Sequence, residues 1–174
     1  MGGLSDEIQI DDLWDYDPMT SDSGKWTWDS TLTKSYSNDG CRFITDSQEH
    51  IGTYNKDLPD NFEVEATFNF ESITEDFFNI NTMQMYFGTY QGVNRLLMFN
   101  SWPPNYYVNS NRLDSNITLK FKLENNILQI INGNNVLLQG NVGTSENILT
   151  IRVYTQSRDN SRIRTIKDIK IRKL

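Results

Sequence analysis

The sequence is poor in the residues that hold small folds together by disulfides or metal ions. Its 174 residues include one cysteine, Cys41, and one histidine, His50. A single cysteine excludes an intrachain disulfide, so we expect Cys41 to be a core or loop thiol. One cysteine and one histidine do not supply the ligand set of a zinc site. His50 stands in a polar stretch, where we expect a surface residue rather than a catalytic base.

Long apolar runs and a basic surface are also missing. No apolar segment approaches the roughly 20 residues that a transmembrane helix requires, so we expect no membrane insertion. The N-terminal residues lack the basic and apolar regions of a signal peptide. The 23 acidic and 16 basic residues give a net charge of −7. Nucleic-acid binding requires a dense positive surface, so we expect no nucleic-acid partner.

Helical periodicity is absent, and a two-residue alternation takes its place. It is clearest between Asn61 and Phe70, where every second residue is apolar. The same alternation occurs in residues 83–87, 117–123 and 149–153. Because successive side chains of a strand face opposite sides, these segments predict antiparallel strands with one buried face. The sequence leaves room for no helix beyond one short turn at Ser72 to Phe78.

Turn residues separate the alternating segments. Asp39-Gly40, Gln91-Gly92, Asn132-Gly133 and residues 141–143 tolerate the positive φ of tight turns. With Asn125-Asn126 they predict a three-strand meander over residues 117–138. About twelve such strands fit two packed sheets better than a closed barrel. We therefore predict an all-β, two-sheet antiparallel sandwich, with residues 1–10 as a flexible lead and residues 11–174 as a single domain.

The order of these segments resembles concanavalin A-like and laminin-G-like jelly-roll domains over roughly residues 12–173. The resemblance is carried by an early strand, a central hairpin, a second hairpin with an Asn-Gly turn and a closing strand: Phe62–Phe68, Gln84–Gly88 with Arg95–Phe99, Ile117–Leu123 with Ile127–Gly133, and Ile166–Ile171. It implies a jelly-roll β-sandwich whose last strand lies beside its first. Such domains are similar to carbohydrate-binding modules and to sugar-binding parts of phage baseplates and adhesins.

Carbohydrate recognition is therefore the leading functional hypothesis. Sugars stack on aromatic rings, while a few polar side chains bind their hydroxyl groups. Only aromatic side chains on the solvent-facing side of a strand can stack on a sugar in this way. The candidate ligand-binding residues are Tyr86, Tyr90, Trp102, Tyr106, Tyr107, Arg152 and Tyr154. The alternative is that these rings pack at the edge of the core; we expect Trp26 and Trp28 to do so.

Two other functions remain open. The same rings would form a protein interface if the chain were a structural or oligomerisation domain of a virion or surface protein. A glycoside hydrolase needs two carboxylates, and Glu63 and Glu65 share one face of a strand. A solvated strand face explains that pair equally well, and we expect a non-catalytic protein.

The termini have opposite charge. Residues 6–22 contain seven acidic side chains and no basic one, whereas the chain from Arg152 onward is mainly basic. We expect the two terminal strands to lie near each other. Candidate ligands for a structural calcium ion are Asp11, Asp12, Asp15 and Asp17. The expected partner is an oligosaccharide or polysaccharide of a cell surface or wall, met as part of a phage tail or microbial surface structure, with homo-oligomerisation or attachment to a larger assembly.

Overall fold

The computed structural model describes residues 15–45, 49–70, 75–91, 93–100, 104, 106–109, 116–142, 148–153 and 162–174. Within these ranges there are fifteen strands and no helix. No helix long and apolar enough to cross a membrane occurs in this part of the chain.

The strands form two antiparallel sheets. The eight-stranded sheet has the order β13 (Asn135–Asn141), β12 (Ile127–Asn132), β11 (Ile117–Glu124), β6 (Phe62–Phe70), β15 (Arg162–Lys173), β4 (Gly40–Thr45) and β3 (Thr33–Ser37), with β1 (Asp15–Asp17) also paired to β15. The seven-stranded sheet has the order β10 (Tyr106–Asn109), β9 (Val93–Phe99), β8 (Met83–Tyr90), β7 (Glu75–Ile80), β14 (Leu149–Val153), β5 (His50–Tyr54) and β2 (Trp26–Trp28).

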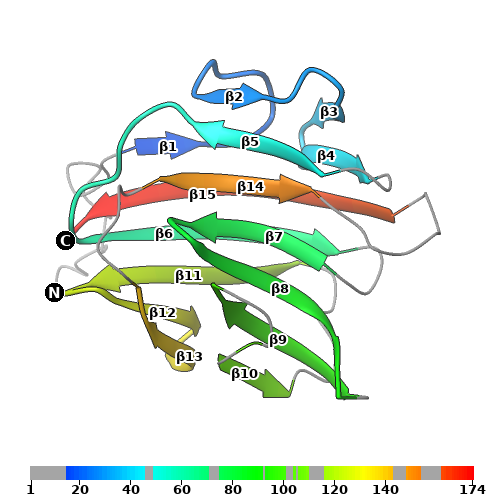
Figure 1. Ribbon diagram of the computed structural model, residues 1–174. Coiled ribbons are helices and arrows are strands. Elements are labelled where there is room, and N and C mark those ends of the chain that lie inside the picture. The colour runs from blue at the N-terminus through cyan, green and yellow to red at the C-terminus, as the bar shows by residue number, and fades with distance from the viewer. Residues whose placement is uncertain are drawn as a thin grey trace, which may run out of the picture.

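The two sheets lie face to face. In Figure 1, β14 and β7 of the seven-stranded sheet pass in front of β15 and β6 of the eight-stranded sheet. Stacking two one-sided sheets buries the apolar face of each. The chain is therefore a two-sheet antiparallel jelly-roll sandwich, as the sequence predicts.

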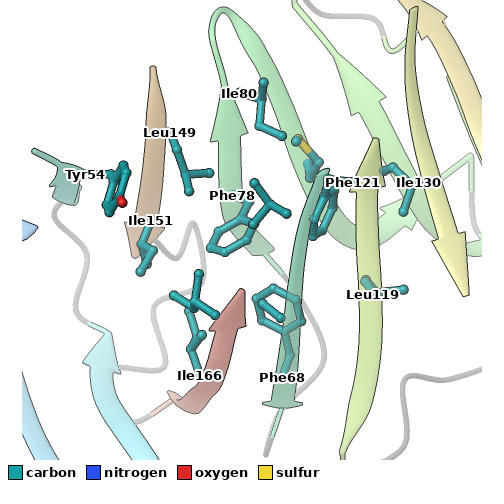
Figure 2. Packing of buried hydrophobic residues seen from close by; sticks show 14 of the residues in the cluster. Tyr54, Phe68, Phe78, Ile80, Leu119, Phe121, Ile130, Leu149, Ile151 and Ile166 are labelled. Atoms are coloured by element: carbon teal, nitrogen blue, oxygen red, sulfur yellow. The ribbon is translucent and has the colours of Figure 1, made fainter. Parts of the chain in front are cut away.

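The core lies between the sheets and includes the predicted inward side chains of β6, β8, β11 and β14 wherever the structure describes them. Phe68 of β6 and Phe121 of β11 come from one sheet, and Phe78 of β7 comes from the other. Figure 2 shows these three rings turned toward one another. The Phe78 ring centroid lies 5.1 Å from that of Phe68 and 5.2 Å from that of Phe121. Edge-to-face and tilted contacts of this kind join the sheets more specifically than aliphatic contact alone.

The predicted turns are confirmed where the structure describes them. Asn125 and Asn126 have φ of 52° and 63°, as both central residues of a type I′ hairpin turn require. They connect β11 to β12, and Gly133, with φ of 58°, lies in the turn from β12 to β13. The three-strand meander is therefore present.

The terminal strands are neighbours, as predicted. β1 pairs antiparallel with β15, and Asp15 lies opposite Ile171. The carboxylate of Asp15 is paired with Lys25 and Lys56, at 2.5 and 3.0 Å, which both lie outside β15.

Three details of the prediction were wrong. Residues 75–78 are extended in β7, where the sequence had left room for one short helical turn over Ser72 to Phe78. The described residues contain fifteen strands rather than about twelve, because β1 and β2 have three residues each, too few to show an alternation. His50 is not a surface residue: only 2% of it is exposed, and its Nδ1 lies 3.1 Å from the Thr31 hydroxyl.

Candidate functional site

The outer face of the seven-stranded sheet carries a row of apolar side chains across three strands. Tyr86 of β8 and Tyr107 of β10 both pair in register with Leu97 of β9. Their chain neighbours Met85 and Met98 are buried in the core, so these three side chains point away from it. We call Tyr86, Leu97 and Tyr107 the ring row.

Neighbouring side chains hold the ring row in place. The guanidinium of Arg95 lies 4.5 Å from the Tyr107 ring centroid and donates hydrogen bonds to Asn109 and Gln91, at 3.1 and 3.0 Å. The Tyr86 ring meets Phe99 edge-on, with centroids 6.4 Å apart. A cation over a ring and an edge-on aromatic pair each restrict ring orientation.

The two tyrosines differ in exposure from the leucine between them. Tyr107 is 43% exposed, whereas Leu97 is fully buried even though it has the outward phase of β9. Leu97 does not belong to the core cluster between the sheets. It is therefore a buried apolar residue of the outer face, in register between the two tyrosines.

Arg152 lies on the same outer face. It belongs to β14, where Ile151 and Val153 face the core, and its Nη2 donates to Glu49 Oε2 at 2.5 Å. β7 separates β14 from β8, so Arg152 is two strand spacings, roughly 10 Å, from the strand of Tyr86.

A second row of polar side chains runs beside the ring row. Thr53, Thr150, Asn79 and Gln84 are successive register partners on β5, β14, β7 and β8. Each stands next to core residues in its strand and therefore faces outward. Gln84 precedes Tyr86 by two residues, so the two rows are roughly 7 Å apart. We call these four residues the amide row.

Three predicted ligand residues share this face: Tyr86, Tyr107 and Arg152. Tyr106 does not, because it has the opposite phase and packs against the core, with its ring in the space that a β-carbon on Gly140 would fill. We therefore leave Tyr106 out of the candidate site. Trp102, Tyr154 and the side chain of Tyr90 lie outside the described residues, although the backbone of Tyr90 pairs with Val93 in β8.

Sequence reasoning missed the residues between the tyrosines. β9 is apolar in both phases, so Leu97 and Phe99 looked like ordinary core residues. Asn79, Gln84 and Thr150 had a usable signal, because each alternates with apolar residues of its strand. Their assembly into one row depends on strand order, which the alternation does not give.

Glu63 and Glu65 lie on the other side of the molecule. Both point outward from β6 of the eight-stranded sheet, since Phe62 and Val64 face the core. Glu63 pairs with Lys120 at 3.1 Å and Glu65 with Lys170 at 3.3 Å. These cross-strand ion pairs explain the two acidic residues as a solvated strand face.

The outer face of the eight-stranded sheet also has a hollow of about 500 Å³. It is lined by polar, charged and aliphatic residues and no aromatic ring: Glu65, Asn116, Ile117, Thr118, Lys120, Ile131, Asn132 and Gly133. Chemistry favours the ring face over this hollow, because an aromatic ring offers a flat apolar surface for stacking.

The predicted calcium ligands within the described residues do not fit a metal site. Asp15 is engaged by Lys25, Lys56 and the Tyr54 hydroxyl. Asp17 is buried and accepts hydrogen bonds from Ser23 at 2.6 Å and the Trp26 indole at 3.0 Å.

These carboxylate oxygens are already occupied by donors, whereas calcium requires them as ligands. No group of three or more His, Cys, Asp or Glu side chains that could hold a metal occurs in the described part of the chain. Asp11 and Asp12 lie outside it.

Comparison with solved structures gives the class of fold. The exoplasmic/lumenal domain of VIP36, bound to Ca²⁺ and Man3GlcNAc, has a TM-score of 0.66 at 10% identity, covering 86% of this chain and 84% of that one. A Bacillus subtilis protein of unknown function with a galectin-like fold has a TM-score of 0.67 at 8% identity, covering 92% and 96%. The Crh5 transglycosylase, in complex with NAG, has a TM-score of 0.67 at 7% identity, covering 91% and 83%.

These similarities establish a concanavalin A-like sandwich of the kind found in lectin domains and in carbohydrate-active enzymes. No protein-family model matches the sequence, and no curated protein matches it significantly. At such low identity the comparisons establish the fold, and the function has to be argued from the site.

Proposed function

We propose that the chain is a non-catalytic carbohydrate-binding domain that binds its ligand on the outer face of the seven-stranded sheet. The observation that carries the proposal is the joint position of the ring row and the amide row on one face. An accessible tyrosine ring offers a stacking surface for the C–H face of a sugar, and the neighbouring amides and hydroxyls can bind its hydroxyl groups.

The structural neighbours support this proposal. The VIP36 domain was crystallised with a mannose-containing oligosaccharide, and Crh5 with NAG. One of the structural neighbours is a transglycosylase, so a catalytic function has to be weighed against binding. In this chain Glu63 and Glu65 are engaged by lysines on the face opposite the rings, which favours binding without bond cleavage.

The first prediction tests binding at the ring row. A glycan array identifies the bound saccharide, and isothermal titration then measures its affinity for the wild type and for Tyr107→Ala and Tyr86→Ala. We expect each alanine variant to bind about 3- to 10-fold more weakly, because an aromatic contact contributes about 0.5–1.5 kcal/mol. Tyr107→Phe keeps the ring and should bind nearly as well as the wild type.

Glu63→Gln and Glu65→Gln are the matched controls, because they change polar residues on the opposite face. Neither should alter affinity, and no reducing sugar should appear on incubation with the bound glycan. Release of reducing sugar that stops in either variant would establish a glycosidase instead. The proposal is contradicted if no glycan on the array binds. It is also contradicted if the alanine variants bind as tightly as the wild type.

The alternative is a structural or oligomerisation domain in which Tyr107 forms a protein interface. Light scattering that shows a stable oligomer in the wild type and a monomer in Tyr107→Ala, without glycan binding, would favour it. A phage-tail or microbial surface context stays a prediction from the sequence; a surface glycan as the bound saccharide would support it.

A further inference from the structure

A second hollow lies on the outer face of the eight-stranded sheet, where β3, β4, β15 and β6 are adjacent. Arg42 of β4, Thr165 of β15 and Asn69 of β6 line it and are successive register partners. Their chain neighbours Cys41 and Ile166 are fully buried, so these three side chains face outward. The volume of about 310 Å³ lies at the lower end of small-molecule sites, which span roughly 300–1,000 Å³.

Lys167 adds a second cation to this hollow. It follows Thr165 by two residues and therefore has the same outward phase on β15. The turn between β3 and β4 lies against it, because a β-carbon at Gly40, where φ is 114°, would be 2.8 Å from Cβ of Lys167. This close approach brings Asp39, the residue before that glycine, into the lining of the hollow. Arg42 and Asp39 are both exposed, so a ligand can reach the charged groups from solvent.

The carboxylates of the same face do not neutralise Lys167. The outward glutamates are paired with other lysines: Glu63 with Lys120 at 3.1 Å, Glu65 with Lys170 at 3.3 Å and Glu124 with Lys122 at 2.8 Å. In the part of the chain that the structure describes, neither Lys167 nor Asp39 makes an ion pair. A cation without a carboxylate partner, in one hollow with Arg42, attracts an anionic group.

We propose that this hollow is a second binding site, which takes a saccharide carrying a carboxylate, such as a hexuronate. Arg42 and Lys167 donate charge-assisted hydrogen bonds to the carboxylate, and the planar guanidinium matches the two oxygens of that group. Asp39 accepts from sugar hydroxyl groups, and the amides of Asn69 and Asn116 can both accept and donate. Asp39 disfavours a bare anion such as sulfate, which it repels and which has no hydroxyl group to donate.

This site goes beyond the proposed function, because it lies on the other sheet and recognises its ligand in a different way. The ring row stacks a sugar on an aromatic ring, whereas this hollow has no aromatic ring among its lining residues. Its selectivity comes from charge, so a neutral sugar has little to gain from it. The two sites therefore take different ligands, and each can be removed without touching the other.

The second prediction tests this hollow with charged and neutral forms of the same sugars. The probes are the methyl glycosides of glucuronate and galacturonate, those of glucose and galactose, and inorganic sulfate, titrated by NMR against the isotope-labelled chain. We expect at least one uronate to bind about 3- to 5-fold more tightly than its neutral counterpart and than sulfate. Its addition should shift the amide signals of Arg42, Asn69 and Lys167. Sulfate that binds as tightly as both uronates would overturn the assignment to a saccharide.

Two variants and a matched control locate the binding. Arg42→Gln and Lys167→Gln should each bind the uronate about 3- to 5-fold more weakly, with the neutral glycosides unaffected. Lys122→Gln removes the same charge from the same outer face, but Lys122 is not among the residues of the hollow and is paired with Glu124. It should bind the uronate as the wild type does. An equal loss in Lys122→Gln would mean general charge attraction and would overturn the site.

The outcomes separate this inference from the proposed function. Uronate binding should persist in Tyr107→Ala. If uronate binding is lost in Tyr107→Ala but kept in Arg42→Gln and Lys167→Gln, this site is wrong and the ring face stands. If no uronate binds while a neutral glycan binds at the ring row, this inference alone fails. If the hollow binds a uronate and no glycan depends on the tyrosines, the proposed binding face fails and this site stands.

Discussion

At the scale of single residues, two glycines make room for aromatic rings. A β-carbon at Gly52 of β5 would lie 2.2 Å from Cζ3 of Trp28, and one at Gly140 of β13 would lie 2.5 Å from Cε2 of Tyr106. Neither glycine is needed for a positive φ. A ring occupies the space where each side chain would be: Trp28 comes from the paired strand β2, and Tyr106 comes from β10 of the other sheet.

The third prediction follows from the contact between Gly52 and Trp28. Gly52→Ala should lower the free energy of unfolding by about 1–3 kcal/mol, because overpacking forces the indole or the backbone to move. Equilibrium urea unfolding measures the change. In a Trp28→Leu background the ring is gone, so the same substitution should cost clearly less; an equal cost in both backgrounds would exclude a clash with the indole.

At the scale of elements, the short strand β1 is held by its carboxylates. Asp15 is engaged by Lys25 from the segment that follows β1, and by Tyr54 and Lys56 at the end of β5. One carboxylate therefore links a strand of the eight-stranded sheet to a strand of the seven-stranded sheet. Burial alone would raise the pKa of Asp15, but these hydrogen bonds outweigh it and hold the pKa well below its usual range.

The fourth prediction is the pH dependence of this link. A carboxylate with a lowered pKa in the folded state adds stability above its unfolded pKa of about 3.9, and this is lost as the pH falls further. Asp15→Asn should therefore be less stable than the wild type at pH 7, and the difference should shrink below about pH 4. Urea unfolding across this range measures it. A difference that stays constant with pH would mean that the charge of Asp15 contributes nothing.

The hairpins of the seven-stranded sheet build most of the ring row. β8, β9 and β10 are consecutive in the chain and adjacent in the sheet, so Tyr86, Leu97 and Tyr107 come together through local connections. Arg152 reaches this face through a long-range pairing, because β14 lies between β7 and β5 in the sheet but is distant from both in the sequence. The tyrosine part of the candidate site was therefore predictable, and its alignment with Arg152 was not.

At the scale of the whole molecule, the core encloses the single thiol. Cys41 of β4 is fully buried, and burial raises its pKa to about 12. A reactive cysteine is a thiolate and is accessible. Cys41 has neither property. The sequence predicted a core or loop thiol, and the structure shows that it is a core residue.

The fifth prediction uses Cys41 to report on unfolding. At pH 8 a thiol reagent should modify the native protein only as fast as the chain opens, and adding urea should accelerate labelling in parallel with unfolding measured by fluorescence. Cys41→Ala/Ser35→Cys, with its thiol on the exposed edge strand β3, should react at once. Rapid labelling of native Cys41 would show that the sheets separate locally.

The sequence alone determined which side chains face the core in the strands that alternate strictly. Alternation with period two is a local property of each strand, so the inward set on β6, β11 and β14 could be assigned without knowing any partner. Turn chemistry was local as well, and Asn125-Asn126 predicted its own hairpin. The alternation and the turn residues were together sufficient to predict a two-sheet sandwich.

The tertiary structure decided which strands are neighbours and therefore which outward side chains meet. Strand pairing depends on backbone hydrogen bonds, which are alike for every residue, and on burial between two sheets that no single strand encodes. That is why Glu63 and Glu65 lie on one outer face with lysines, while Tyr86, Tyr107, Arg152 and Asn79 gather on the other.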